Sequence, residues 1–250
     1  MNQKRKDVTI SEAKKVIGLK STAYREYLSA RLLTNNHFFQ QAALMMTTCL
    51  EKEMKAYLFT IGESFKKIHD LVPLYEKLNA TKPEFAKKLN LGFLKALSII
   101  YKTRYYDQLL PGYNWVFVKN KFLAEFDYTF SVLEPMLRVK PARDKEISKT
   151  KYESDIEEKL EILFVNNYVV TKMEKDLFLT SPDLVYEFRI ASTHEIFEAQ
   201  YPIPYNRQEE KNKFLYEGLK EKNTSQFQAS HAGYPKDEMD ALYKMLGIEK

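Results

Sequence analysis

The chain has 250 residues, 44% of them hydrophobic and 29% charged, as is ordinary for a globular protein that buries a sizeable core. Its single cysteine, Cys49, excludes an internal disulfide and suits a reducing compartment. The basic N-terminus is not followed by the apolar run of a secretory signal, and no stretch approaches the roughly 20 apolar residues of a membrane span. We therefore expect a cytoplasmic protein without a membrane contact.

Positive charge is concentrated in the first part of the chain. Residues 1–140 hold 23 Lys and Arg against 13 Asp and Glu, a net charge of +10, whereas residues 141–250 hold 16 against 21, a net charge of −5. This asymmetry indicates that the N-terminal part faces an anionic partner such as a nucleotide or RNA. The alternative is that the two parts of the chain attract each other.

Two long helices are predicted first. Residues 11–35 predict a helix with Ser11 as its N-cap. Its expected buried face consists of Ala13, Ile17, Tyr24, Leu28 and Leu32. Over residues 36–60, apolar side chains advance in steps of three and four from Phe39 to Ile61, which predicts a second helix with one buried stripe. Gly62 suits the position just past its C-terminus, and Cys49 is expected in the core.

Three further helices are predicted before residue 139. Asp70 begins a short one that runs to about residue 79, and Pro83 lies in the first turn of another that runs to about residue 101. From Trp115 to Leu137, apolar residues again step by three and four, which predicts a last helix over about residues 115–139. We therefore expect an up-and-down bundle of five helices, with no strand before residue 139.

The region after the bundle is less regular. Residues 140–151 are charged and contain Pro141, so they are predicted to link a domain at 1–139 to a C-terminal region at 152–250. That region is expected to be smaller and either mixed α/β or irregular. Helices are expected over 154–163, 206–222 and 236–246, an extended segment over 201–204, and β-prone runs at 164–165, 168–170, 177–179 and 185–190.

Three strings in order resemble the HEPN domain family (higher eukaryotes and prokaryotes nucleotide-binding). The first covers residues 37–62, with a Glu-Lys…Lys-Ala pattern and a closing glycine. The second is Ile-His-Asp-Leu at 68–71, and the third covers 97–109, with a Tyr-x-Thr-Arg-Tyr core. The resemblance extends over about residues 20–138. The sequence departs from the family at Tyr106, where many members have proline, while Asp107 keeps the family's aspartate.

The resemblance implies a fold and a functional setting. HEPN domains are five-helix, up-and-down units that often pair as dimers, and many are encoded beside small nucleotidyltransferases. It therefore implies a nucleotide- or RNA-linked role, a homodimer and a nucleotidyltransferase partner. The fold class that we predict is mainly α: a HEPN-like bundle followed by the smaller C-terminal region.

Arg104 is the first candidate for ligand binding. It lies on a predicted turn between helices, followed by Tyr105, Tyr106 and Asp107. A guanidinium there could form paired hydrogen bonds with a phosphate, while a tyrosine ring offers a stacking face. The structural alternative is that Arg104 pairs with Asp107 or caps a helix C-terminus.

A second group of candidates comes from the first two strings. His69 could bind phosphate or act as a general acid, although a histidine beside a capping Asp70 is more often a plain hydrogen-bonding residue at a helix start. Glu51 and Lys55 lie four residues apart, a spacing that predicts a surface ion pair contributing about 0.2–0.5 kcal/mol. The resemblance implies that this pair faces the groove near Arg104.

The sequence argues against the chemistry of ribonuclease members of the family. Those members carry an Arg followed four to six residues later by a His, and no histidine follows Arg104 at that distance. Arg31 and His37 have a six-residue offset, but they lie at the join of the first two helices, the wrong place for that motif. His194, Glu195 and Glu198 lack the second histidine of a His-Glu-x-x-His metal site. We expect no catalytic residue, metal or cofactor.

Three functions follow as hypotheses. The first is a dimeric binding module for a nucleotide or RNA, with a site made by Arg104, Tyr105, Asp107, His69, Lys55 and Glu51. The second is a ribonuclease or toxin component of a toxin–antitoxin pair that uses His37 or His69 in an unusual position. The third is a structural or regulatory protein whose acidic C-terminal region masks the basic part. Each hypothesis built on the resemblance requires the Thr-Arg-Tyr turn to lie beside the His-Asp-Leu turn.

Overall fold

The computed structural model describes residues 10–63, 68–105, 109, 113–137, 149–181, 183–190 and 196–203. Within these residues the protein is mainly helical and has one three-stranded antiparallel sheet. The predicted mainly α fold class is thereby confirmed. No helix among the described residues combines the length and the apolar character that crossing a membrane requires.

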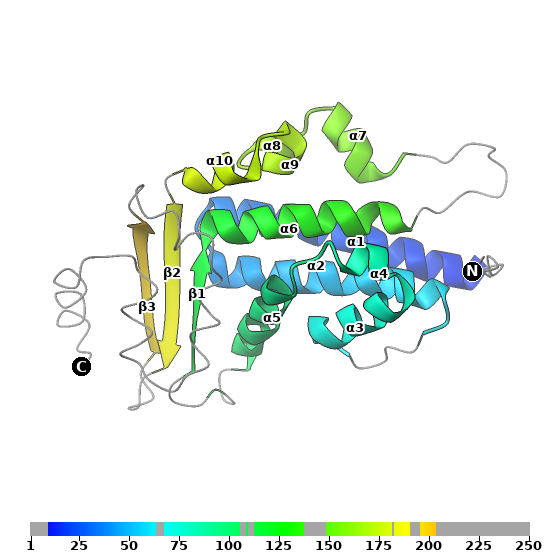
Figure 1. Ribbon diagram of the computed structural model, residues 1–250, viewed down its shortest axis with the longest axis horizontal. Coiled ribbons are helices and arrows are strands. Elements are labelled where there is room, and N and C mark those ends of the chain that lie inside the picture. The colour runs from blue at the N-terminus through cyan, green and yellow to red at the C-terminus, as the bar shows by residue number, and fades with distance from the viewer. Residues whose placement is uncertain are drawn as a thin grey trace.

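Three long helices form the centre of the molecule and lie side by side in Figure 1. They are α1 (Ile10–Asn35), α2 (Phe39–Thr60) and α6 (Lys119–Leu133). One side of this layer carries α3 (Leu71–Thr81), α4 (Pro83–Ala86), α5 (Leu91–Ile100) and the 3-10 turn η1 (Tyr101–Arg104). The other side carries α7 (Lys151–Glu157), α8 (Glu161–Phe164), α9 (Tyr168–Thr171) and α10 (Lys175–Thr180).

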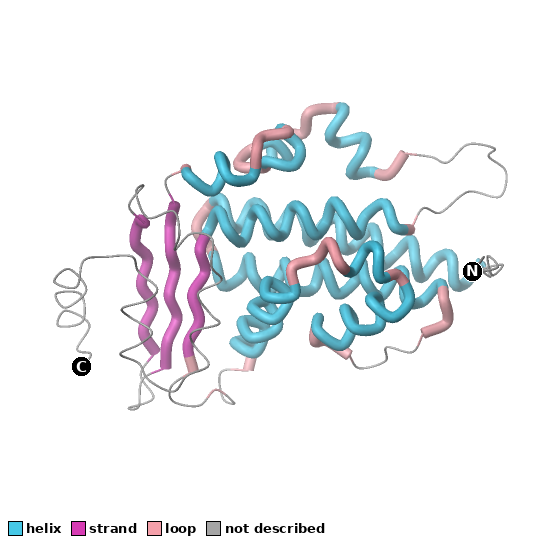
Figure 2. Tube along the Cα trace, in the orientation of Figure 1, coloured by secondary structure: helices cyan, strands magenta, loops and turns pink. Residues whose placement is uncertain are grey.

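The sheet closes one end of the helical layers, as Figure 2 shows most clearly. Its strands are β1 (Asn114–Val118), β2 (Asp183–Ile190) and β3 (Ile196–Ile203), in that spatial order. Both pairings are antiparallel: Trp115 lies opposite Phe188 on β2, and Glu187 lies opposite Ala199 on β3. The sheet therefore joins a strand from the first half of the chain to two strands from the second half.

The second helix follows its sequence pattern. Six of the seven residues of its predicted stripe are buried, from Phe39 through Tyr57, and Ile61 is partly buried. The helix ends as predicted, because Gly62 adopts a positive φ of 78° and its N–H donates to the carbonyl of Phe59. Cys49 is fully buried, as expected.

The first helix presents only part of its predicted face, because Tyr24 is buried and Leu28 packs against the core but other members are exposed. Ile17 and Leu32 are 50% and 54% exposed, whereas Tyr27 and Arg31 are fully buried. Ser11 lies inside α1, which begins at Ile10, so the N-cap prediction is wrong. The hydrophobic pattern does not predict this face, because the face includes Arg31 and such a pattern assigns charged residues to the surface.

The short helices on the α3 side have local causes. Asp70 caps α3 by accepting from the N–H of Val72 at 2.9 Å, as predicted. The helix predicted to begin at Pro83 stops after one turn, and a new one starts where Asn90 accepts from the N–H of Phe93 at 3.2 Å. The single helix predicted over 83–101 is therefore two, α4 and α5.

The last predicted helix begins too early. Trp115 and Val118 lie on strand β1, and the helix starts only at Lys119, so the expectation of no strand before residue 139 is wrong. The four residues from Trp115 to Val118 are all buried. Such a run of aromatic and β-branched residues suits a strand covered on both faces. The helical spacing of Trp115 and Val118 is therefore coincidental.

Three of the four β-prone runs predicted after the linker do not form strands, so these predictions are wrong. Phe164, Tyr168–Val170 and Leu177–Leu179 belong to the short helices α8, α9 and α10. Asn167 explains one of these, because its side chain accepts from the N–H groups of Val169 and Val170 and so starts a helical turn. The run at 185–190 does lie in a strand, β2, and the expected extended segment from residue 201 lies in β3 as far as Ile203.

Residues on both sides of the predicted linker share one hydrophobic core. Phe130 of α6 packs edge-on against Tyr152 of α7, with ring centroids 5.3 Å apart. Trp115 of β1 stacks on Phe188 of β2 at 5.6 Å. The predicted linker is described only at residues 149–151, and the predicted helices at 206–222 and 236–246 lie outside the described residues. The domain boundary itself stays a prediction.

Candidate functional site

The candidate residues come from three elements of the bundle. Glu51 and Lys55 belong to α2, His69 lies just before α3, and Arg104 ends η1 with Tyr105 directly after it. Asp107 and its neighbour Tyr106 lie outside the described residues, so the predicted roles of these two residues stay predictions.

Two hydrogen bonds join the C-terminal part of α5 to the start of α3. The Ser98 hydroxyl of α5 donates to Asp70 Oδ1 at 2.8 Å, and the Leu71 N–H donates to Ser98 Oγ at 3.2 Å. Ser98 precedes Arg104 by six residues. These contacts agree with the predicted proximity of the Thr-Arg-Tyr and His-Asp-Leu turns.

Glu51, Lys55 and His69 form one chain of contacts. The Lys55 ammonium pairs with Glu51 Oε1 at 2.6 Å, and His69 Nδ1 lies 3.2 Å from the same oxygen. The predicted pairing of Glu51 with Lys55 is confirmed. Its predicted place on the surface is wrong, because the two side chains are only 9% and 11% exposed. The His69 side chain, by contrast, is 62% exposed. A buried carboxylate thus orients an accessible imidazole.

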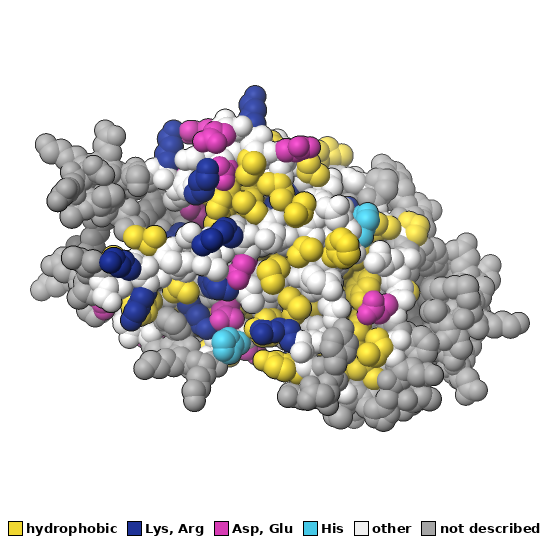
Figure 3. Space-filling model, turned by 180° about the vertical axis from the view of Figure 1, so that it is seen from behind, with side chains coloured by type: hydrophobic (Ala, Val, Ile, Leu, Met, Phe, Trp, Pro, Cys, Tyr) yellow, Lys and Arg dark blue, Asp and Glu magenta, His cyan; other side chains and the backbone are white. Residues whose placement is uncertain are grey.

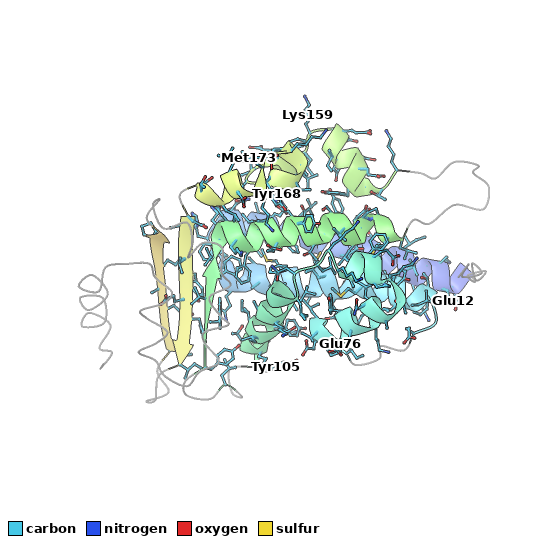
Figure 4. The ribbon with its side chains drawn as sticks, in the orientation of Figure 1. Glu12, Glu76, Tyr105, Lys159, Tyr168 and Met173 are labelled. Atoms are coloured by element: carbon cyan, nitrogen blue, oxygen red, sulfur yellow. The ribbon has the colours of Figure 1, made fainter. Side chains whose placement is uncertain are left out.

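Arg104 lies between two tyrosine rings. Its guanidinium carbon is 4.7 Å from the ring centroid of Tyr101 and 5.8 Å from that of Tyr105, within the range of cation–π attraction. The Arg104 guanidinium also donates a hydrogen bond to the Tyr101 hydroxyl. Tyr105 is 48% exposed and lies at the outer edge of the molecule near the end of α5 (Figure 4). Among the described residues, no carboxylate pairs with Arg104.

Tyr101 connects the two groups electrostatically. Partial burial raises the pKa of its hydroxyl, the Arg104 charge opposes the rise, and the Glu51 carboxylate adds to it. Arg104 contacts Tyr101 directly, and Glu51 acts on the same phenol through its charge. Sequence reasoning did not single out Tyr101, although its position three residues before Arg104 places the two side chains on the same side of a helical turn.

The alternative pair, Arg31 and His37, does not form a site. Arg31 is fully buried and pairs with the Asp127 carboxylate of α6, and it donates to the carbonyls of Ile162 and Val165. His37 is exposed in a left-handed turn with a φ of 66°. Arg31 therefore has a structural role. Glu198 lies exposed on β3, while His194 and Glu195 lie outside the described residues.

The candidate residues lie apart from the cavity of about 630 Å³ that the structure contains. None of the five candidate residues that the structure describes lines it. Acidic and basic side chains are interspersed on the face shown in Figure 3, so the positive charge of the N-terminal part does not form a continuous patch on that face. The specific grouping of a guanidinium, two rings and an imidazole is therefore more informative than net charge. It offers hydrogen bonds to an anion and stacking for a planar group.

Comparison with known proteins finds a family model that matches the part of the chain carrying this site. The family model of the HEPN domain matches residues 18–115, which include the α2 string, the His-Asp-Leu start of α3 and the Thr-Arg-Tyr turn. The match ends at residue 115, before α6, whereas the resemblance in the sequence extends to about residue 138. No curated protein matches the chain. No solved structure matches it either.

Proposed function

With the HEPN domain at residues 18–115 as the premise, we propose that this protein is a binding module for a nucleotide or a short RNA. In this proposal a ligand phosphate binds the Arg104 guanidinium and a base stacks on Tyr105. The observation that carries it is the Arg104 side chain, which lies against two tyrosine rings with no carboxylate partner among the described residues.

The chemistry of Arg104 fits a phosphate ligand. A guanidinium has five N–H donors in a planar fork, and a hydrogen bond to the Tyr101 hydroxyl uses one of them. The Tyr101 ring lies against the guanidinium, with its centroid 4.7 Å from the guanidinium carbon, and this contact restricts the Arg104 side chain, so less conformational entropy is lost when a phosphate binds. Paired charge-assisted hydrogen bonds of this kind are stronger than those between neutral groups.

His69 and Lys55 extend the proposed site. The exposed imidazole can donate to a second phosphate or a ribose hydroxyl, and its contact with Glu51 orients the ring. Lys55 is mostly buried and already paired with Glu51, so its role is to hold that carboxylate in place. Asp107 stays a predicted member of the site.

Binding measurements test this proposal. Isothermal titration calorimetry with AMP, ADP, ATP and single-stranded RNA decamers should detect at least one ligand, with an affinity that falls as salt rises. Arg104→Ala should weaken that binding by about tenfold or more, because a charge-assisted contact contributes about 1.5–3 kcal/mol. Arg25→Ala removes an equal charge from the exposed face of α1 and is the matched control. An Arg104→Ala variant that binds every detected ligand like the control would contradict the proposal.

A second candidate is RNA cleavage, and the contact between His69 and Glu51 favours it. A carboxylate that orients an imidazole is the arrangement used for general acid–base catalysis. If His69 acts in this way, RNA is cleaved by the intact chain, and both His69→Ala and Glu51→Gln abolish cleavage. Absence of cleavage across pH and metal conditions would leave binding as the function of the site.

The partners implied by the family stay part of the proposal. We expect a homodimer, which light scattering of the purified chain measures. We also expect association with a small nucleotidyltransferase, which co-purification with the product of a neighbouring gene would test. A monomer at all concentrations would contradict the first expectation, and an absence of complex with such a protein would contradict the second.

A further inference from the structure

A cavity of about 630 Å³ lies between α1, α2, the 3-10 turn η3 (Glu134–Met136) and α7. Its volume falls in the range of small-molecule sites, about 300–1,000 Å³. Because none of its lining residues belongs to the proposed nucleotide site, its function is separate from that of Arg104.

One wall of the cavity is aromatic. Tyr24, Phe130 and Tyr152 all line it. The Tyr152 ring meets the other two edge-on, with centroids 6.2 Å from Tyr24 and 5.3 Å from Phe130. Ile17 also lines it and is 50% exposed. This wall suits the apolar body of a small ligand.

Charged side chains also line the cavity. Glu53 of α2 lines it with a side chain only 2% exposed. Glu53 Oε2 accepts from the Lys20 ammonium at 3.1 Å, whereas Oε1 has no hydrogen-bond partner among the residues that the structure describes. Lys20 also donates to the backbone carbonyl of Glu134 and lies 4.0 Å from the Glu134 carboxylate. One ammonium is therefore shared between two carboxylates.

A buried carboxylate oxygen without a donor is costly, and a ligand that brings a donor would remove that cost. The terminal torsion of a glutamate has a broad energy well, so a small rotation turns Oε1 toward the cavity. Arg25, Lys149 and Lys151 also line the cavity, but Lys149 pairs with Glu157 and Lys151 with Asp155. Of the described lining cations, Lys20 is the one that pairs with Glu53 and Glu134, so these two carboxylates favour a cationic donor over a neutral one. The aromatic wall also favours a cation, because the faces of aromatic rings attract ammonium groups.

We propose that this cavity binds a small organic ammonium ion, whose apolar body packs against Tyr24, Phe130 and Tyr152 and whose charged nitrogen pairs with Glu53 and Glu134. The ligand adds the second cation that two carboxylates need. An organic anion of the same shape is repelled by these carboxylates.

The protonation of Glu53 gives the site a characteristic pH dependence. Burial raises the pKa of Glu53 to about 7, the Lys20 charge opposes the rise and Glu134 adds to it. The Cys49 thiol, one turn earlier on α2, has a pKa raised by burial and stays neutral. Asp155 of α7, which also lines the cavity, accepts a hydrogen bond from the Tyr24 hydroxyl and forms an ion pair with Lys151. An alkyl ammonium stays charged up to about pH 10. Its binding therefore strengthens as Glu53 ionises with rising pH.

Three probes with one phenyl ring separate charge from shape. Phenethylammonium, 2-phenylethanol and 3-phenylpropionate are titrated into the full chain by calorimetry or ligand-observed NMR at pH 8. We expect saturable binding of phenethylammonium at least about tenfold tighter than that of the alcohol, and no binding of the carboxylate. Equal binding of all three probes, tighter binding of the carboxylate, or no binding of phenethylammonium at millimolar concentration overturns the proposal.

A variant and a pH series locate the site. Glu53→Gln keeps the shape of the side chain and should weaken phenethylammonium binding by at least about tenfold. Glu76→Gln, on the outer surface of α3 (Figure 4), should leave it unchanged. In the unmodified protein, affinity should rise by at least about threefold from pH 6 to pH 8. An affinity that is independent of pH, or a Glu53→Gln variant that binds as well as the unmodified chain, contradicts the assignment without any reference to nucleotide binding.

Discussion

Arg31 and Arg104 belong to the same bundle but have opposite surroundings. Arg31 is fully buried, and its guanidinium contacts the Asp127 carboxylate and two backbone carbonyls. Arg104 lies at the surface, where two tyrosine rings and one hydroxyl surround it. The difference teaches that an arginine whose donors are used inside the fold holds elements together, whereas one that keeps donors toward solvent can recognise a ligand.

The buried arginine joins three parts of the chain. Its own helix is α1, Asp127 lies on α6, and the carbonyls of Ile162 and Val165 belong to the α8 segment. Burial is the largest single effect on the pKa of Arg31 and lowers it, but the interactions with Asp127, Tyr27 and Tyr152 together raise the pKa above its ordinary value, so the guanidinium stays charged. Tyr27 donates to the other Asp127 oxygen at 2.8 Å. The resulting cluster fixes the α7–α10 side against the central helices.

The largest expected effect comes from breaking this cluster. Arg31→Ala leaves Asp127 buried without its counter-ion, which costs about 3–5 kcal/mol of unfolding free energy. Equilibrium urea denaturation measures the change, with Arg25→Ala as the surface control, expected within about 0.5 kcal/mol of the unmodified chain. A loss at Arg31 no greater than that at Arg25 would show that the buried cluster contributes little.

The next largest effect concerns a second buried charged residue, Glu53. Its folded-state pKa of about 7 lies above its ordinary value of 4.5, so between these pH values the folded chain holds a proton that the unfolded chain has lost. The contribution of Glu53 to the unfolding free energy is therefore fully present below about pH 4.5. As the pH rises through 7, this contribution is lost, and the unfolding free energy falls by on the order of 3 kcal/mol. The difference in unfolding free energy between the unmodified chain and Glu53→Gln, measured from pH 5 to pH 8, should show this slope. A constant difference would mean that Glu53 titrates normally.

A smaller effect is expected at the base of the candidate site. Asp70→Ala removes the α3 N-cap and the acceptor of the Ser98 hydroxyl, and caps of this kind contribute about 1–2 kcal/mol. Asp70→Asn keeps an acceptor and should lose less than half as much. Thermal unfolding of the two variants compares them, and equal losses would rule out the cap as the cause.

The smallest expected change in stability is at Arg104 itself. Arg104→Ala removes an exposed side chain with no carboxylate partner among the described residues, so the unfolding free energy should change by about 0.5 kcal/mol or less. A loss comparable to that of Arg31→Ala would make Arg104 a structural residue and remove the contrast between the two arginines.

The sequence predicted those features that depend on local rules. The stripe of α2, the Gly62 ending and the Asp70 cap each follow from spacing or from one residue's chemistry. Strand β1 could not be found in this way, because Trp115 and Val118 happen to continue the helical spacing of α6, and their strand pairing depends on β2, about 70 residues later. Short apolar runs such as Tyr168–Val170 fit a helix or a strand equally well until a cap such as Asn167 decides.

The candidate site was predicted in outline but not in its burial. The pairing of Glu51 with Lys55 follows from their spacing, yet neither burial nor the contact of Glu51 with His69 can be read from one helix alone. Arg31 stayed hidden for a related reason. Its partner Asp127 lies 96 residues away in the sequence, and only the packing of α1 on α6 shows that an arginine occupies the buried face.

The central claim is that the surface around Arg104 binds a nucleotide or RNA phosphate, and one titration series tests it most directly. The affinity of the unmodified chain and of Arg104→Ala for a single-stranded RNA decamer is measured by fluorescence anisotropy from 50 to 300 mM salt. We predict that the variant binds about tenfold or more weakly and that its logarithmic salt slope is smaller by about one phosphate contact. The same affinity and slope for both proteins would contradict the claim.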